Sequence, residues 1–181
     1  MTQEIDGIVR DPKNNLGALH EGFPFWIVDN LLDNMDTDDA EIGVQGNEHG
    51  IDICKIDTEE KIITFGQAKW SDTFEHKISG EVISRLASAP LYLLDDKVKG
   101  NETFDAVKKE FKKIHETEEG YKINFVLVVA GKLTSGQKDE IEAQNAQGTI
   151  QLKNKTYSVE GYEAWDKDED RKSTRLNSSH T

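Results

Sequence analysis

The sequence predicts an α/β domain of three layers, in which helices flank a mixed central sheet. Segments with the three-and-four spacing of amphipathic helices alternate with short runs rich in β-branched and aromatic residues. One run, residues 121–131 (YKINFVLVVAG), is almost wholly apolar, which is typical of a central strand covered on both faces. The order helix, strand, strand, helix, helix, strand, helix, strand then indicates the layered class.

The first element expected is a helix over about residues 16–34, because its apolar residues recur at spacings of three and four. Pro24 lies near its middle and argues against an unbroken helix. The apolar face consists of Leu19, Phe23, Trp26, Ile27 and Leu31. The acidic, glycine-containing residues 35–50 are expected to form a loop or a short helix.

Two β-rich runs, residues 50–57 and 61–70, predict a hairpin, because only the polar residues Thr-Glu-Glu separate them. Side chains of a strand alternate between its two faces. This alternation divides the first run into two faces, Ile51 with Ile53 and Asp52 with Cys54 and Ile56.

Two helices are expected next. The first covers about residues 73–94, and its inner stripe is Ile78, Val82, Ile83, Leu86 and Ala87. The second covers residues 101–117 and places lysines opposite an apolar side made of Phe104, Val107, Phe111 and Ile114.

After the apolar strand, residues 134–148 predict another helix, with Thr134 or Ser135 as its cap and Gly148 as its stop. Residues 149–165 are expected to close the fold as a further strand region.

The composition excludes several classes of protein. The chain has 181 residues, a net charge of −13 and 35% hydrophobic residues, which suits one domain with its own core. Its apolar runs are far shorter than the roughly 20 residues of a membrane span, and its polar start does not resemble an export signal. Cys54 is the single cysteine, so we expect no intramolecular disulfide and a cytoplasmic location. The negative charge disfavours broad binding of nucleic acid or anionic lipid, so a nucleic-acid site must be local or metal-bridged.

Residues 170–181 differ from the rest of the chain. They are basic and polar without apolar periodicity, and from Asp170 to His180 they back-translate into the sequencing adapter that begins GATCGGAAGAGCACACG. We interpret them as a non-native tail. The expected organisation is a polar arm over residues 1–15, a folded α/β domain over 16–169 cut from a longer protein, and this tail. The tail carries three cations and one anion, so its removal changes the net charge from −13 to −15.

Three polar residues of the predicted hairpin are candidates for chemistry. Gln67 and Lys69 share one face of their strand, and a turn at about Glu59 places Asp52 opposite Gln67. On half-buried strands these groups are costly unless they bind a ligand or satisfy one another. Asp52, Gln67 and the carbonyl of Ala68 offer oxygen atoms of the kind that Mg²⁺ prefers. Lys69 would then orient or deprotonate a metal-bound water, which suggests metal-assisted phosphodiester hydrolysis.

A simpler interpretation is also open. Asp52 and Lys69 can form an ordinary cross-strand ion pair, worth at most about 1 kcal/mol when exposed. From spacing alone, the ion pair is the favoured interpretation.

Residues 50–70, GIDICKIDTEEKIITFGQAKW, resemble the core of the PD-(D/E)xK nuclease superfamily, in the variant whose second acidic residue is glutamine. With the preceding GNEHG loop and the flanking helices, they resemble more narrowly the N-terminal region of abortive-infection phage-resistance (AIPR) proteins. The resemblance covers about residues 16–165, and its specific motif is confined to residues 48–70. It implies a restriction-endonuclease-like fold and Mg²⁺-dependent cleavage of nucleic acid, with Mn²⁺ as an alternative ion and DNA favoured over RNA.

The resemblance also implies roles for individual residues. Asp52 matches the motif aspartate, Gln67 the substituted acidic position, and Lys69 the motif lysine, and these three form the expected catalytic set. Glu48 matches an acidic position in the loop, and Glu21 is the nearest candidate for a metal-binding glutamate on the first helix. The expected metal ligands are therefore Asp52, Gln67, Glu48 and Glu21, although solvated positions remain open for both glutamates. Because Gln67 removes one negative charge, metal affinity is expected to depend on Glu48 or Glu21.

Two further features have ordinary interpretations. His49 lies beside the motif and is suited to touch a phosphate, but an exposed loop position is favoured. A lysine stripe on one predicted helix is expected to be a solvated face rather than a phosphate-binding patch; it consists of Lys108, Lys109, Lys112 and Lys113.

Three functions are compatible with these observations. The first is the nuclease domain of a phage-defence protein. The second is a catalytically inactive nuclease-fold module that binds nucleic acid or a protein partner, and the third is a scaffold whose acidic face binds a basic protein. The nuclease hypothesis requires that the side chains of Asp52, Gln67 and Lys69 converge.

Overall fold

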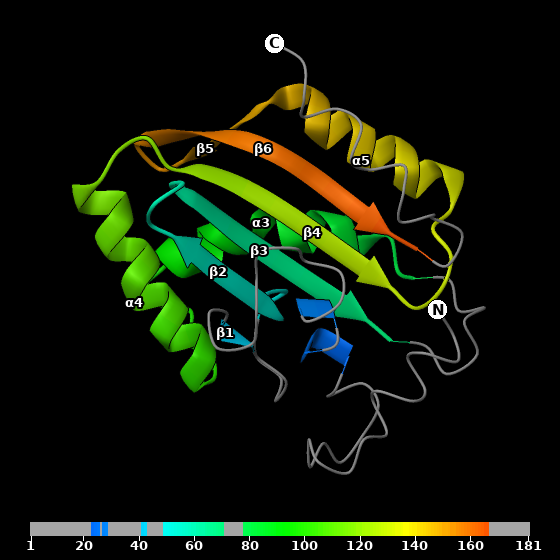
Figure 1. Ribbon diagram of the computed structural model, residues 1–181, viewed down its shortest axis with the longest axis horizontal. Coiled ribbons are helices and arrows are strands. Elements are labelled where there is room, and N and C mark those ends of the chain that lie inside the picture. Colours follow the sequence, from blue (N-terminus) through cyan, green and yellow to red (C-terminus); the bar gives the residue numbers. More distant parts are fainter. Residues whose placement is uncertain (1–22, 26, 29–40, 43–48, 71–77, 167–181) are drawn as a thin grey trace.

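The computed structural model describes residues 23–25, 27–28, 41–42, 49–70 and 78–166 (Figure 1). Three predicted segments lie outside these residues: the polar arm, the tail interpreted as non-native, and most of the first helix.

A mixed sheet of six strands forms the centre of the described fold, in the order β1-β2-β3-β4-β6-β5 (Figure 1). The central strands β3, β4 and β6 run parallel, whereas β1, β2 and β5 pair antiparallel with their neighbours. Parallel neighbours need crossover connections, which α3 and α4 provide between β3 and β4. The predicted α/β class with a mixed sheet is therefore confirmed. The strands are β1 Glu41–Ile42, β2 Ile53–Asp57, β3 Ile62–Lys69, β4 Lys122–Val129, β5 Thr149–Leu152 and β6 Lys155–Trp165.

The predicted hairpin forms from β2 and β3, and its turn is fastened by Asp57, whose Oδ1 accepts the backbone N–H groups of Glu59 and Glu60. The region predicted at residues 149–165 is also a hairpin. It is divided between β5 and β6 at Lys153, which adopts a left-handed backbone conformation with φ 53°.

Three helices cover one face of the sheet: α3 Glu81–Leu94, α4 Glu102–Thr117 and α5 Ser135–Gln147. Their apolar side chains form one core with Phe65 of β3 and Phe125 of β4. The prediction for α3 began too early, since residues 78–80 are not helical and 71–77 lie outside the described residues. A glycine inside a helix costs about 1 kcal/mol, so the helix begins after Gly80.

The caps of α4 and α5 explain where these helices begin. Asn101 Oδ1 accepts the N–H of Phe104 at 2.8 Å. Thr134, rather than Ser135, caps α5 through a reciprocal capping box with Gln137, and Gly148 ends it in the left-handed conformation with φ 63°. The predicted apolar side of α4 is buried as expected: Phe104, Val107, Phe111 and Ile114.

Five described residues of the N-terminal segment, 23–25 and 27–28, lie on the opposite face of the sheet. Residues 23–25 and 27–28 are helical, and Phe23, Ile27 and Val28 pack against Val126 of β4. Strand β4 is thus buried on both faces, as its apolar run predicts, and the fold has three layers.

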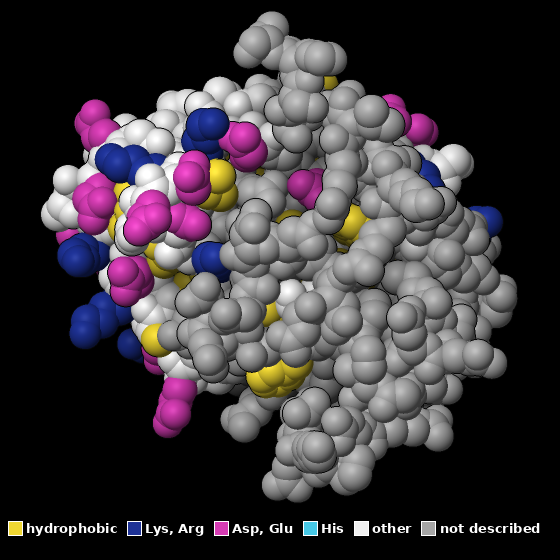
Figure 2. Space-filling model, in the orientation of Figure 1, with side chains coloured by type: hydrophobic (Ala, Val, Ile, Leu, Met, Phe, Trp, Pro, Cys, Tyr) yellow, Lys and Arg dark blue, Asp and Glu magenta, His cyan; other side chains and the backbone are white. Residues whose placement is uncertain are grey.

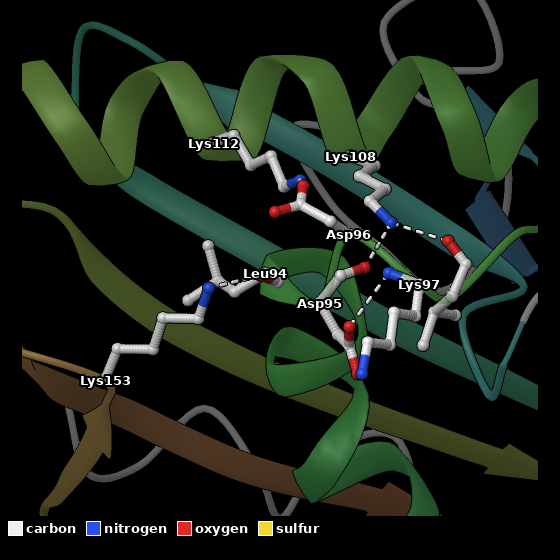
Figure 3. Close-up of polar contacts among 8 residues, drawn as sticks. Leu94, Asp95, Asp96, Lys97, Lys108, Lys112 and Lys153 are labelled. Atoms are coloured by element: carbon white, nitrogen blue, oxygen red, sulfur yellow. Dashed lines mark hydrogen bonds and ion pairs between the residues drawn. The ribbon is translucent and has the colours of Figure 1, made fainter.

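Two lysines donate hydrogen bonds to backbone carbonyls at the C-terminal end of α3 and just beyond it (Figure 3). Lys108 Nζ donates to the carbonyl of Val98 at 2.6 Å and also to that of Asp95, while Lys153 Nζ donates to that of Leu94. Ammonium groups are favourable at this end because the helix dipole is negative there. Burial, with the neighbouring ammonium of Lys112 as a smaller cause, lowers the pKa of Lys108.

The lysine stripe of α4 therefore has two halves. Lys109 and Lys113 are exposed, as a solvated face requires. Lys108 and Lys112 are only partly exposed; Lys108 binds the carbonyls at the end of α3, and Lys112 pairs with Asp96. The expectation of a solvated stripe therefore holds for Lys109 and Lys113 but not for Lys108 and Lys112, because α3 and α4 pack side by side and bring the end of α3 against these two lysines.

Candidate functional site

Asp52, Gln67 and Lys69 line one pocket of about 420 Å³. Asp52 lies in the bend directly before β2, and the other two residues lie at the C-terminal end of β3. Arg85 and Tyr92 of α3 line it from the helix layer. The pocket therefore lies where the end of the hairpin meets the first helix that covers the sheet.

The hairpin register brings the three predicted residues together. Ile53 pairs with Gly66, so Asp52 lies level with Gln67. The backbone N–H of Asp52 donates to the Gly66 carbonyl at 2.9 Å, and Asp52 Oδ2 accepts the N–H of Ala68 at 2.8 Å. The second bond orients the carboxylate along β3, beside the side chains that project toward α3.

One part of the predicted alternation was wrong. Ile51 packs with Cys54 in the core on the helix side, whereas Ile53 packs against the N-terminal segment on the opposite face. Asp52 is a bend rather than a strand residue, so the two-residue period begins only at Ile53. The bend lets the Asp52 carboxylate reach the backbone of Ala68.

Gln67 is the most buried polar residue of the pocket, with 3% of its surface exposed. Its Oε1 atom is buried and finds no hydrogen-bond donor in the described structure. An unsatisfied buried acceptor costs about 1–3 kcal/mol. A bound water, a cation or a donor from a ligand would remove this cost.

Asp52 and Gln67 offer oxygen donors of the kind that Mg²⁺ takes. Within the described ranges, no group of three or more His, Cys, Asp or Glu side chains is placed to hold a metal. Mg²⁺ does not need one, because it binds through one or two carboxylates and keeps waters and substrate oxygens as its other ligands. Asp52 supplies a carboxylate, and the unsatisfied Gln67 amide supplies a neutral oxygen. The other predicted ligands, Glu48 and Glu21, lie outside the described residues.

Arg85 and Tyr92 are site residues that the sequence analysis did not single out. They are seven residues apart and so lie on one side of α3, two turns from each other. The Arg85 side chain is 55% exposed, and its ion pair with Glu81 is long, at 3.7 Å. The sequence did offer a signal for this pair. It places a cation and an aromatic residue seven positions apart, on the side of the helix away from the buried stripe.

His49 does not occupy the exposed loop position expected for it. Its Nε2 is 2.8 Å from the carbonyl of Lys99, to which it donates. Its ring packs against Phe104 and Tyr92, with ring centroids 4.9 Å and 5.7 Å apart. His49 is therefore only partly exposed and forms part of the pocket wall.

Gly50 allows Arg85 to enter the pocket. Its φ is +88°, and a Cβ atom there would lie 2.9 Å from Arg85 Cγ. We expect Gly50→Ala to lower the free energy of unfolding by about 1–3 kcal/mol, because backbone strain and a collision act together. Urea denaturation measures the effect.

Gly148→Ala is the matched control, because Gly148 also has a positive φ, 63°, but open space around it. Its free energy of unfolding should fall only by the cost of backbone strain. If the two variants lose equal stability, Gly50 is not needed to give Arg85 room.

No helix within the described ranges has the length and apolar character to cross a membrane. The chain matches no protein-family model, and searches of curated proteins and of solved structures find nothing similar to it.

Proposed function

We propose that this chain is the nuclease domain of a phage-defence protein and hydrolyses the phosphodiester bonds of nucleic acid with Mg²⁺. The observation that carries the proposal is the convergence of Asp52, Gln67 and Lys69 in one pocket, with the buried Gln67 Oε1 left without a donor in the described structure. An ordinary ion pair between Asp52 and Lys69 would not explain that unsatisfied oxygen. The cytoplasm is the proposed location.

Each residue of the site has a distinct role in this proposal. Asp52 binds the metal, and the Ala68 N–H holds its carboxylate in orientation. Gln67 adds a neutral oxygen ligand. Mg²⁺ held by Asp52 and Gln67 would supply a Lewis acid that polarises a phosphoryl oxygen and makes a water molecule more acidic. Lys69 Nζ donates hydrogen bonds to the phosphate oxygens, where negative charge grows in the transition state. The attacking water forms the new bond to phosphorus and gives its proton to solvent, while the bond to the leaving oxygen breaks and that oxygen takes a proton from solvent.

Substrate capture depends on local charge. The net charge of −13 repels phosphates at long range. Figure 2 shows acidic and basic side chains interspersed over the side of the molecule that carries α4, without a broad basic patch among the residues coloured there. Lys69 and Arg85 are the cations that line the pocket, and in this proposal they supply the local attraction for the substrate.

A degradation assay tests the proposal. The purified chain is incubated with labelled DNA and with RNA of the same sequence, in Mg²⁺, in Mn²⁺ and in EDTA. We expect shortening in either ion, faster for DNA, and none in EDTA. Binding of nucleic acid in EDTA, with no degradation in either ion, would support the inactive module instead.

Gln67→Glu should lower the stability of the metal-free protein and raise its affinity for Mg²⁺. A carboxylate at this buried position, next to Asp52, is costly without a cation. We expect a lower melting temperature than the wild type in EDTA, and a rise on addition of Mg²⁺ that exceeds the wild-type rise. Calorimetric titration should show at least about tenfold tighter Mg²⁺ binding, as a second carboxylate ligand implies.

Gln144→Glu, on a partly exposed side of α5, is the control and should give no such metal-dependent rise. If Mg²⁺ raises the melting temperature of Gln67→Glu no more than that of the wild type, Gln67 does not face a metal.

A further inference from the structure

An exposed aromatic ring stands at the rim of the candidate site. Leu91 and Tyr92 are the two large apolar side chains that are exposed within the described ranges, at 45% and 38%. They are neighbours on α3, but only Tyr92 lines the pocket that holds Asp52 and Lys69. Isolated exposed apolar residues are common on protein surfaces, whereas an aromatic face beside a polar pocket is suited to stack on a ligand.

The ring of Tyr92 is supported from within the protein. The His49 ring lies 5.7 Å from it at an angle of 41°, and His49 in turn packs on Phe104. The hydrogen bond from His49 Nε2 to the carbonyl of Lys99 fixes the imidazole. A ring that is already held in place loses little conformational entropy when a ligand stacks on it.

Arg85 supplies the charge that such a ligand needs. It lies two turns before Tyr92 on the same side of α3, and it reaches the same pocket. Its ion pair with Glu81 is long and joins two exposed side chains, so it is weak. A guanidinium in this state is available to a phosphate, which it can bind through two hydrogen bonds.

The size of the pocket and the burial of Gln67 limit which form of nucleic acid can enter, a single strand or a duplex. Gln67 is 3% exposed, so a phosphate that reaches it must enter the space between the hairpin end and α3. A volume of about 420 Å³ has room for about one nucleotide, not for a double helix. In a duplex, moreover, the bases are paired and stacked on one another, whereas single strands present their faces to aromatic side chains.

We propose that the site binds single-stranded nucleic acid, with one base stacked on Tyr92 and a neighbouring phosphate held by Arg85. This inference rests on the proposed function for its choice of ligand, because nucleic acid is the substrate expected there. It adds to the proposed function the single-stranded form of the substrate. It also adds two binding residues that lie outside the motif, Tyr92 and Arg85.

Binding measured without catalysis tests the inference. Fluorescence anisotropy in EDTA, and again in Ca²⁺, compares a labelled twelve-nucleotide DNA strand with its duplex. We expect tighter binding of the single strand. Tyr92→Ala should weaken single-strand binding about tenfold, and Tyr92→Phe should retain it, since stacking needs the ring and not the hydroxyl. Arg85→Ala should weaken it as well, with a smaller salt dependence.

Leu91→Ala is the matched control, because Leu91 is the exposed neighbour that does not line the pocket. It should bind as the wild type does, and thermal melting confirms that all variants are folded. Equal losses in Tyr92→Ala and Leu91→Ala, or tighter binding of the duplex, would overturn the inference.

The two proposals fail separately. A chain that degrades nucleic acid but is indifferent to Tyr92→Ala refutes the stacking role alone. A chain that binds single strands through Tyr92 but degrades nothing in Mg²⁺ or Mn²⁺ refutes the nuclease and keeps the binding site.

Discussion

Asp52→Asn is expected to slow the Mg²⁺-dependent degradation of nucleic acid at least about 100-fold without unfolding the protein. The substitution preserves shape, and the Asn side-chain oxygen can still accept the N–H of Ala68 that Asp52 accepts at 2.8 Å. What it removes is the carboxylate charge, which is the main electrostatic attraction for the cation among the described pocket residues. Initial rates of oligonucleotide cleavage, together with thermal melting, measure the two effects.

Lys69→Ala should cause a comparable loss of rate by a different route. It removes the ammonium that donates to the phosphate oxygens in the transition state, so Mg²⁺ binding by calorimetry should remain while cleavage fails. Because both residues serve one chemical step, the double variant should lose little more than the worse single variant. Losses that simply multiply would show that Asp52 and Lys69 act independently.

Exposed residues of the same types provide controls. Asp139→Asn on α5 and Lys113→Ala on α4 make the same changes outside the pocket, and both should cleave at the wild-type rate. An Asp52→Asn variant with wild-type activity would reject the proposed mechanism outright.

The sequence was sufficient to locate the hairpin and its polar cluster. A turn of a few polar residues between two β-rich runs determines the register, and the register determines which residues lie opposite each other. Asp52 and Gln67 could therefore be placed together from their distances to the turn. The buried faces of α4 and β4 were predictable for a similar reason, since a helix or strand period assigns side chains to a face.

Contacts between layers were not predictable in this way. The places of Arg85 and Tyr92 in the pocket depend on how α3 packs across the sheet, and no local pattern specifies that packing. His49 looked exposed because its partners, Lys99 and Phe104, lie about 50 residues further along the chain. The bend at Asp52 was also missed, because strand alternation assumes a regular backbone.

Phe111→Ala is expected to cost about 3–5 kcal/mol of unfolding free energy, the largest stability effect predicted for this chain. Phe111 is fully buried on α4, and its ring meets Phe65 of β3 in an edge-to-face contact with centroids 5.6 Å apart. It also packs against Tyr157 of β6. Truncation therefore opens a cavity between the helix layer and two strands. Urea denaturation followed by circular dichroism measures the loss.

Two further variants distinguish the cost of the cavity from the cost of losing the aromatic ring. Phe111→Leu keeps much of the volume and should cost less than about 1.5 kcal/mol beyond its lost aromatic contacts. Leu91→Ala removes a side chain that is already 45% exposed and should change stability by about 0.5 kcal/mol or less. If Phe111→Ala lowers the free energy of unfolding less than Phe111→Leu does, α4 is not packed on β3 through Phe111.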